Sequence, residues 1–219
     1  MAYSKSPALV GRIDGTTPDV LRWHQVIEYV DLKNEKISLA ANQKAVVFLE
    51  FAVDEGVIRN KGRVGAKAGS KAIANAFAGF PIHFENTRLI HGGTIVCENG
   101  DLESAQSELA RYAEKILSYG CMPIVLGGGH EVTYGHFLGI KNFAKNKKVG
   151  IINFDAHFDI RPLEKEVGPT SGTGFWQIGN EARMKGEPFK YMALGIQKFS
   201  NTKLLFNLAE EFGVEYAFG

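Results

Sequence analysis

The segment that most constrains the fold is an apolar run that ends in three metal-binding residue types. Residues 148–152 read as a short buried strand that follows a charged, turn-prone segment. Asp155, His157 and Asp159 come next, at every second position. If the extended conformation continues, alternate side chains share one face, and two carboxylates and an imidazole converge. The carboxylates would raise each other's pKa, and a divalent cation would relieve that repulsion.

Each of these side chains also has a purely structural interpretation. Asp155 could cap the next element, and His157 could be a buried histidine with a satisfied hydrogen bond. Because three potential ligands fall within five residues at the end of an apolar run, we favour a metal site.

Apolar and amphipathic segments alternate along most of the chain. We predict strands at 44–53, 94–97, 121–126, 148–152, 189–196 and 214–217. We predict helices at 21–30, 66–78, 102–119, 132–143, 175–184 and 202–212. Such alternation is typical of a parallel α/β sheet with helices on both faces. We assign this domain to residues 44–219 and a peripheral N-terminal arm to residues 1–43.

The composition is that of an ordinary soluble domain. Of the 219 residues, 45% are hydrophobic and 22% are charged, and the formal net charge is +1. We therefore expect no binding to nucleic acid and none to a membrane surface. The two cysteines, Cys97 and Cys121, lack Cys-x-x-Cys spacing, which favours a reducing compartment and a cytoplasmic location. No apolar run approaches the length of a membrane span.

A second chemically rich segment follows the predicted strand at 121–126. Three glycines precede His130, and glycine lets the backbone turn sharply. Such a turn could aim the imidazole across the sheet, although it could equally be a simple helix start. In parallel sheets, ligands bind beyond the carboxyl ends of the strands, where both segments lie. We therefore add His130 as a fourth ligand; a carboxylate-rich set favours Mn²⁺ over Zn²⁺, and metal-assisted hydrolysis follows.

Three segments together resemble the ureohydrolase family, which includes arginases, agmatinases and formimidoylglutamases. They are residues 60–66 (Asn-Lys-Gly-Arg-Val-Gly-Ala), 127–130 (Gly-Gly-Gly-His) and 153–159 (Asn-Phe-Asp-Ala-His-Phe-Asp). Within the family, residues 54–56, 59–63 and 171–175 look most like formimidoylglutamases. The resemblance covers residues 44–218 and implies a three-layer α/β fold with a parallel sheet.

The resemblance also implies a site with two Mn²⁺ ions. His130, Asp155 and Asp159 would bind one ion, and Asp155 and His157 the other, with Asp155 as the bridge. The reaction implied is hydrolysis of N-formimidoyl-L-glutamate to L-glutamate and formamide in histidine breakdown. Asp159 would be catalytic by orienting the attacking hydroxide. We also expect a homo-oligomer.

The long predicted loop at 160–174 is where specificity is expected. Arg161 would form a bidentate pair with a carboxylate of a small amidine substrate, although a surface ion pair is the alternative. Asn60 and Ser171, from the matching segments, would also bind substrate. Phe175 stands where arginase-like relatives carry a histidine that helps proton transfer, which argues against an arginase.

One part of the family pattern has no counterpart in this chain. A later strand ending in Asp-x-Asp supplies further metal ligands in the family, and nothing after Asp159 resembles it. We therefore expect the first two thirds of the enzyme, ending after about six strands, with weak or single-metal binding and little activity by itself. In the family, two more strands lie between those predicted here at 121–126 and 148–152, so these two would pair directly, stay open or recruit another chain. The alternatives are another amidine hydrolase, such as an agmatinase, and a catalytically inactive module that binds a partner.

Overall fold

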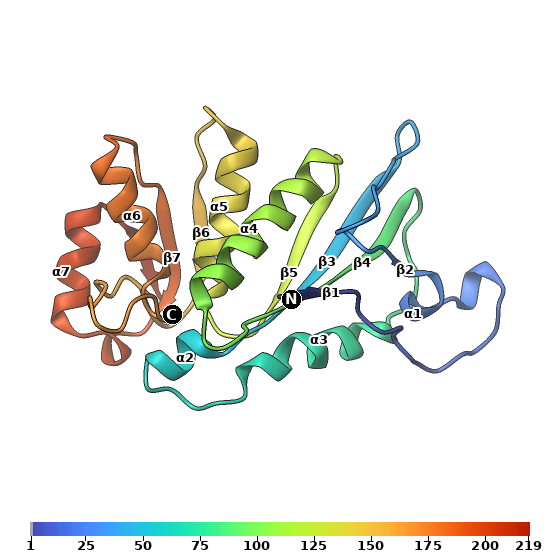
Figure 1. The fold of residues 1–219 in the computed structure, drawn as a ribbon, viewed down its shortest axis with the longest axis horizontal. Helices are drawn as coiled ribbons and strands as arrows, with labels where there is room; N and C mark the ends of the chain where they lie inside the picture. Colours follow the sequence, from blue (N-terminus) through green and yellow to red (C-terminus); the bar gives the residue numbers. More distant parts are fainter. Residues whose placement is uncertain (1) are drawn as a thin grey trace.

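The computed structural model describes residues 2–219, which form two separate sheets flanked by helices (Figure 1). The strands are β1 (Tyr3–Ser4), β2 (Glu28–Tyr29), β3 (Lys44–Ala52), β4 (Thr87–Val96), β5 (Met122–Gly127), β6 (Ile151–Phe154), β7 (Tyr191–Ile196) and β8 (Glu215–Phe218). The helices are α1 (Trp23–Val26), α2 (Glu55–Arg59), α3 (Gly69–Ala78), α4 (Leu102–Ser118), α5 (Val132–Ala144), α6 (Gly174–Met184) and α7 (Lys203–Phe212). Short 3-10 turns lie at Pro18–Val20, Ala66–Ala68 and Lys198–Ser200.

The first sheet has β3 at its centre, parallel to β4 on one side and to β5 on the other. Because β3 is covered on both faces, its sequence is an almost continuous apolar run. Val47, Leu49 and Phe51 pack in one core with the apolar stripe of α4. Phe48 points the other way and packs with Phe77 of α3. This half of the molecule therefore has the expected three layers.

The second sheet is parallel, in the order β6-β7-β8, and its core is formed with α6 and α7. Tyr191 and Ala193 of β7 are buried in that core. The alternate residues of β6 are not covered: the exposed fractions of Ile152 and Phe154 are 65% and 81%. Among the described residues, this sheet is therefore covered on one face only.

The sequence left open how the strands β5 and β6 relate, and in the structure they do not pair. Each of the two strands has one edge that pairs with no other strand among residues 2–219. Figure 1 shows β6 and β7 set apart from β3, β4 and β5. Met122 on the β5 edge is 61% exposed. Open apolar edges of this kind are sites where another strand can add.

The expectation of a peripheral arm over residues 1–43 is wrong for the described residues 2–43. β1 pairs antiparallel with β4 and β2 pairs parallel with it, and Leu32 is fully buried in the first core. The phenolic hydroxyl of Tyr3 accepts a hydrogen bond from the Leu32 N–H and donates one to the Gly92 carbonyl. These contacts tie the segment to the sheet. The domain boundary at residue 43 stays a prediction.

Other boundaries also differ from the predicted ones. The predicted helix at 21–30 is replaced by α1 and β2, because Trp23 packs among Phe48 and Phe77 and the chain then pairs with β4. The strand predicted at 94–97 begins at Thr87, and α2 was not expected. No helix within residues 2–219 is both long and apolar enough to cross a membrane.

Candidate metal centre

The turn that carries His130 is built from glycines pressed against the end of β3. The Gly128 N–H donates to the Phe51 carbonyl at 3.1 Å, and the Gly129 N–H donates to the Val53 carbonyl at 2.8 Å. A Cβ on Gly128 would lie 2.2 Å from the Val53 oxygen, so no side chain fits. The glycines therefore fix where α5 begins and where His130 stands.

The loop after β6 carries the acidic residues. The Asp155 N–H continues the ladder to the Leu194 carbonyl at 3.0 Å, and the strand conformation then ends. The Asp155 carboxylate accepts the His157 N–H at 2.9 Å, which closes a tight turn. Asp159 has a φ of +47°, in the left-handed region. This change of direction, not a continued strand, brings Asp159 back towards Asp155.

The structure brings together three of the four predicted ligands. His130 Nδ1 lies 3.1 Å from Asp155 Oδ2 and 2.5 Å from Asp159 Oδ2. These three residues offer ligand atoms that all lie within 4.8 Å of one another. His157 is beside the group and not in it: its Nδ1 lies 3.3 Å from the other Asp155 oxygen, and its side chain is 52% exposed. Asp155 thus stands between the two histidines.

The two carboxylates of the cluster favour a positive charge beside them. Burial by itself would lower the pKa of His130, but the hydrogen bond to Asp159 and the charges of Asp159 and Asp155 raise the pKa above its ordinary value. In the protein alone, the two carboxylates therefore favour the protonated imidazole. A divalent cation can take over that role, and two carboxylates with one imidazole suit Mn²⁺. The residues present therefore fit a manganese ion.

Phe175 forms an apolar wall of the cluster. Its ring meets the His130 ring edge-on, at a centroid distance of 5.7 Å, and stacks on Tyr191 at 4.2 Å. Its N–H donates to the Asp159 carbonyl at 3.3 Å, which links the start of α6 to the acidic loop. A phenyl ring cannot transfer a proton.

The three predicted substrate-binding residues lie close to one another. Arg161 and Asn60 line one cavity of about 260 Å³, and the Asn60 amide donates to Ser171 Oγ at 3.1 Å. The Arg161 N–H donates to the Gly172 carbonyl at 2.9 Å, which ties the start of the loop to its end. Their roles stay predictions.

The structure adds two residues that the sequence analysis passed over. Lys61 lines the same cavity as Arg161. A cationic residue directly after Asn60 was the feature of the sequence that could have indicated a role in substrate binding. Glu131 is fully buried directly after His130, and its carboxylate accepts the Gly56 N–H at 2.9 Å. Its position next to His130, a predicted ligand, could have drawn attention to Glu131. Nothing in the sequence, however, predicts its contact with Gly56, which is 75 positions away.

The chain matches the sequence profile of the arginase family over residues 44–218. It is 44% identical over 209 residues to formimidoylglutamase of Geobacillus thermodenitrificans, covering 94% of this chain and 62% of that protein. It is 42% identical over 202 residues to formimidoylglutamase of Clostridium tetani, covering 90% of this chain and 60% of that protein. The chain thus spans about three fifths of the length of these curated relatives.

Solved structures share the fold of this chain. Formimidoylglutamase from Bacillus subtilis has a TM-score of 0.75 at 20% identity, over 95% of this chain and 64% of that one. A Trypanosoma cruzi formiminoglutamase with Mn²⁺ has a TM-score of 0.68 at 25% identity, over 86% and 65%. The profile match, the sequence relatives and the shared fold agree, and the chain belongs to the arginase family.

Proposed function

We propose that this chain carries metal- and substrate-binding residues of a manganese-dependent amidine hydrolase that acts on N-formimidoyl-L-glutamate. The observation that carries the proposal is a cavity whose lining has three cationic residues, Arg59, Lys61 and Arg161, against one acid, Glu164. Arg161 follows Asp159 of the cluster by two residues. The formimidoylglutamases that match most of the chain support the substrate, and histidine degradation would be the setting.

Four residues would hold manganese. His130, Asp155 and Asp159 would bind one ion, while Asp155 and His157 by themselves would hold a second ion only weakly. When bound, manganese would activate water for attack on the amidine carbon. Overall, the bond from that carbon to the glutamate nitrogen breaks; the oxygen of water remains in formamide, and the nitrogen leaves as the amine of glutamate.

The other residues of the site would position the reactants. The carboxylate of Asp159 would orient the attacking oxygen by accepting its hydrogen bond. Phe175 would exclude water from the side of His130 without accepting a proton. Arg161 and Lys61 would bind the substrate carboxylates, while Asn60 and Ser171 would supply hydrogen bonds.

Two alternatives are separable from this proposal. An agmatinase-like activity would place a cationic substrate without a carboxylate against Arg161 and Lys61, which is electrostatically unfavourable. An inactive binding module would agree with a cluster of only three converging ligands in the described residues. A cytoplasmic location and a homo-oligomer also stay predictions.

Calorimetric titration in the presence of Mn²⁺ tests the substrate without requiring turnover. We expect N-formimidoyl-L-glutamate to bind more tightly than agmatine, and Arg161→Met to weaken its binding by about tenfold or more, because a charge-assisted pair is lost. Arg12→Met, an exposed arginine distant in sequence, is the control. Equal or tighter binding of agmatine would reject the proposed substrate.

A further inference from the structure

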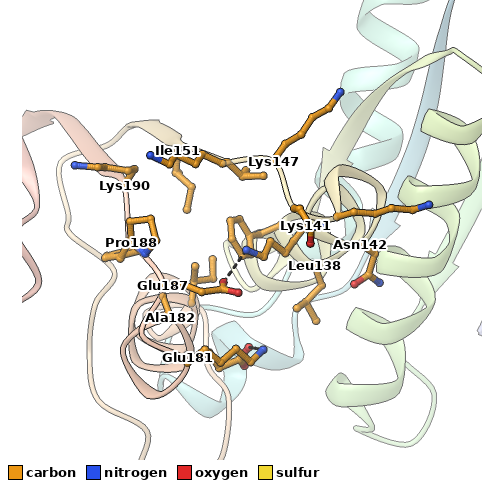
Figure 2. Close-up of a pocket in the computed structure, with 18 residues that line it drawn as sticks. Leu138, Lys141, Asn142, Lys147, Ile151, Glu181, Ala182, Glu187, Pro188 and Lys190 are labelled. Carbon is orange, nitrogen blue, oxygen red and sulfur yellow. Dashed lines mark hydrogen bonds and ion pairs between the residues drawn. The ribbon is translucent and has the colours of Figure 1, made fainter.

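A second cavity lies at the far end of β6 from the metal cluster. Its volume is about 370 Å³, and it opens between α5 and α6 where β6 and β7 begin (Figure 2). Residues 145–149 and 187–190 complete its walls. Asp155 and Asp159 of the metal cluster come after Phe154, at the other end of β6. The cavity is therefore separate from the proposed active site.

The cavity concentrates positive charge in a chain whose formal net charge is only +1. Six of its lining residues are lysines: Lys141, Lys145, Lys147, Lys148, Lys185 and Lys190. Two are acids, and both already have partners. Glu187 pairs with Lys141 at 2.7 Å, while Glu181 accepts the Tyr134 hydroxyl and lies 4.0 Å from Lys185.

Four of the lysines thus have no acidic partner within residues 2–219: Lys145, Lys147, Lys148 and Lys190. Figure 2 shows Lys147 and Lys190 on opposite sides of the cavity with their ammonium groups directed outward, and Lys141 directed to Glu187. Like charges held around a concave wall repel one another, and the wall focuses their field. An anion at the opening would relieve that repulsion.

Part of the cavity wall is apolar. It is formed by Phe137, Leu138, Ile151, Ile178, Ala182 and Phe189. Several of these side chains also pack in the core of the second sheet, so the surface is fixed by the fold. A cavity of this volume whose walls combine apolar and charged groups is suited to a small molecule.

We propose that this cavity binds a small organic phosphate, with its aromatic or apolar body inside and its phosphate among the lysines at the opening. Lysine ammonium groups bind phosphate as point charges, and the apolar part of the wall distinguishes an organic phosphate from the free ion. The assignment is independent of the proposed hydrolase activity, because it uses neither the metal cluster nor the cavity at Arg161.

Titration calorimetry with 1-naphthyl phosphate tests the site, with EDTA present so that no metal ion holds the phosphate. We expect one site per chain, tighter binding than for 1-naphthol or inorganic phosphate, and weakening as salt is added. Replacing Lys147→Glu and Lys148→Glu together should weaken binding by about tenfold or more. The matched control combines Lys71→Glu and Lys203→Glu, which reverses two exposed lysines outside the cavity.

A second variant tests the interior. Ala182→Phe should fill the cavity and weaken the binding of 1-naphthyl phosphate, while the binding of inorganic phosphate should not change. Equal weakening by the lysine control would mean diffuse charge attraction and would overturn the site. The same conclusion follows if 1-naphthyl phosphate and inorganic phosphate bind alike, or if neither binds. The lysine variants change only exposed positions, so they report on the site even if Ala182→Phe does not fold.

Discussion

The buried carboxylate of Glu131 accepts the backbone N–H of Gly56, and this bond joins the turn that carries His130 to the predicted substrate loops. The Gly56 carbonyl in turn accepts the N–H groups of Asn60 and Ser171, each at 3.0 Å. The backbone of one residue, Gly56, therefore connects three segments of the site. The fit is tight, because a Cβ on Gly56 would lie 2.7 Å from the Glu131 side chain.

We predict that Glu131→Ala lowers the free energy of unfolding by about 2–4 kcal/mol, because it leaves a cavity and an unpaired buried N–H. Hydrogen exchange should accelerate in residues 56–62 and 169–172. Glu131→Gln keeps an acceptor oxygen and should restore most of the protection. Glu210→Ala, at an exposed position of α7, is the control. Unchanged exchange in both loops for Glu131→Ala would contradict the link.

Metal content is the second prediction. With three converging ligands, we expect one manganese ion or fewer per chain by elemental analysis after purification with Mn²⁺. Asp159→Asn should weaken the binding of Mn²⁺ by about tenfold or more, because it removes a charged candidate ligand. His157→Ala should weaken it much less, since His157 lies outside the group. Two tightly bound ions would show that the site is completed in solution, and a larger loss for His157→Ala would reverse the assignment.

Stability should depend on pH through Glu50, which is buried in the first sheet. His91 Nε2 lies 3.1 Å from its carboxylate, and Ser70 donates to it at 3.0 Å. Burial raises the pKa of Glu50, but the adjacent His91 imidazole and the hydrogen bond from Ser70 outweigh burial, and the pKa lies below its ordinary value of 4.5. The stabilisation is therefore fully present above pH 4.5 and is lost as the pH falls through the lowered pKa.

Urea unfolding between pH 7 and pH 3 measures this effect. We expect Glu50→Gln to cost about 1–3 kcal/mol at pH 7, with the difference from the parent shrinking below pH 4.5. Glu210→Gln should show no such trend. A cost that is the same at every pH would mean that Glu50 acts through shape and not through its charge.

The open strand edges predict association. Ile152 and Phe154 on β6 expose apolar surface beside an unpaired edge, so we expect self-association that increases with concentration. Phe154→Lys should reduce it in sedimentation velocity. Phe199→Lys is the matched control, because Phe199 is 89% exposed but lies outside the strands. Equal effects of the two variants would place the contact elsewhere.

Much of the site was predictable because its signals are local. Asp155, Asp159 and the glycines before His130 are adjacent in sequence to strands whose apolar runs are unmistakable, and parallel strands place such segments at one edge. The reason given for their convergence was nevertheless wrong. The strand stops at Phe154, and the left-handed Asp159, not continued alternation, brings the carboxylates together.

The sequence by itself determined the alternation of strands and helices, the family and the three candidate ligands that the structure groups, because periodicity and short motifs are properties of neighbouring residues. Tertiary structure alone decided that residues 2–43 join the first sheet, that β5 and β6 stay apart and that His157 lies outside the cluster. It also decided that Glu131 meets Gly56 and that lysines from α5 and from the loops before β6 and β7 surround one cavity. These outcomes depend on packing between segments distant in sequence, whose free energy no local pattern records.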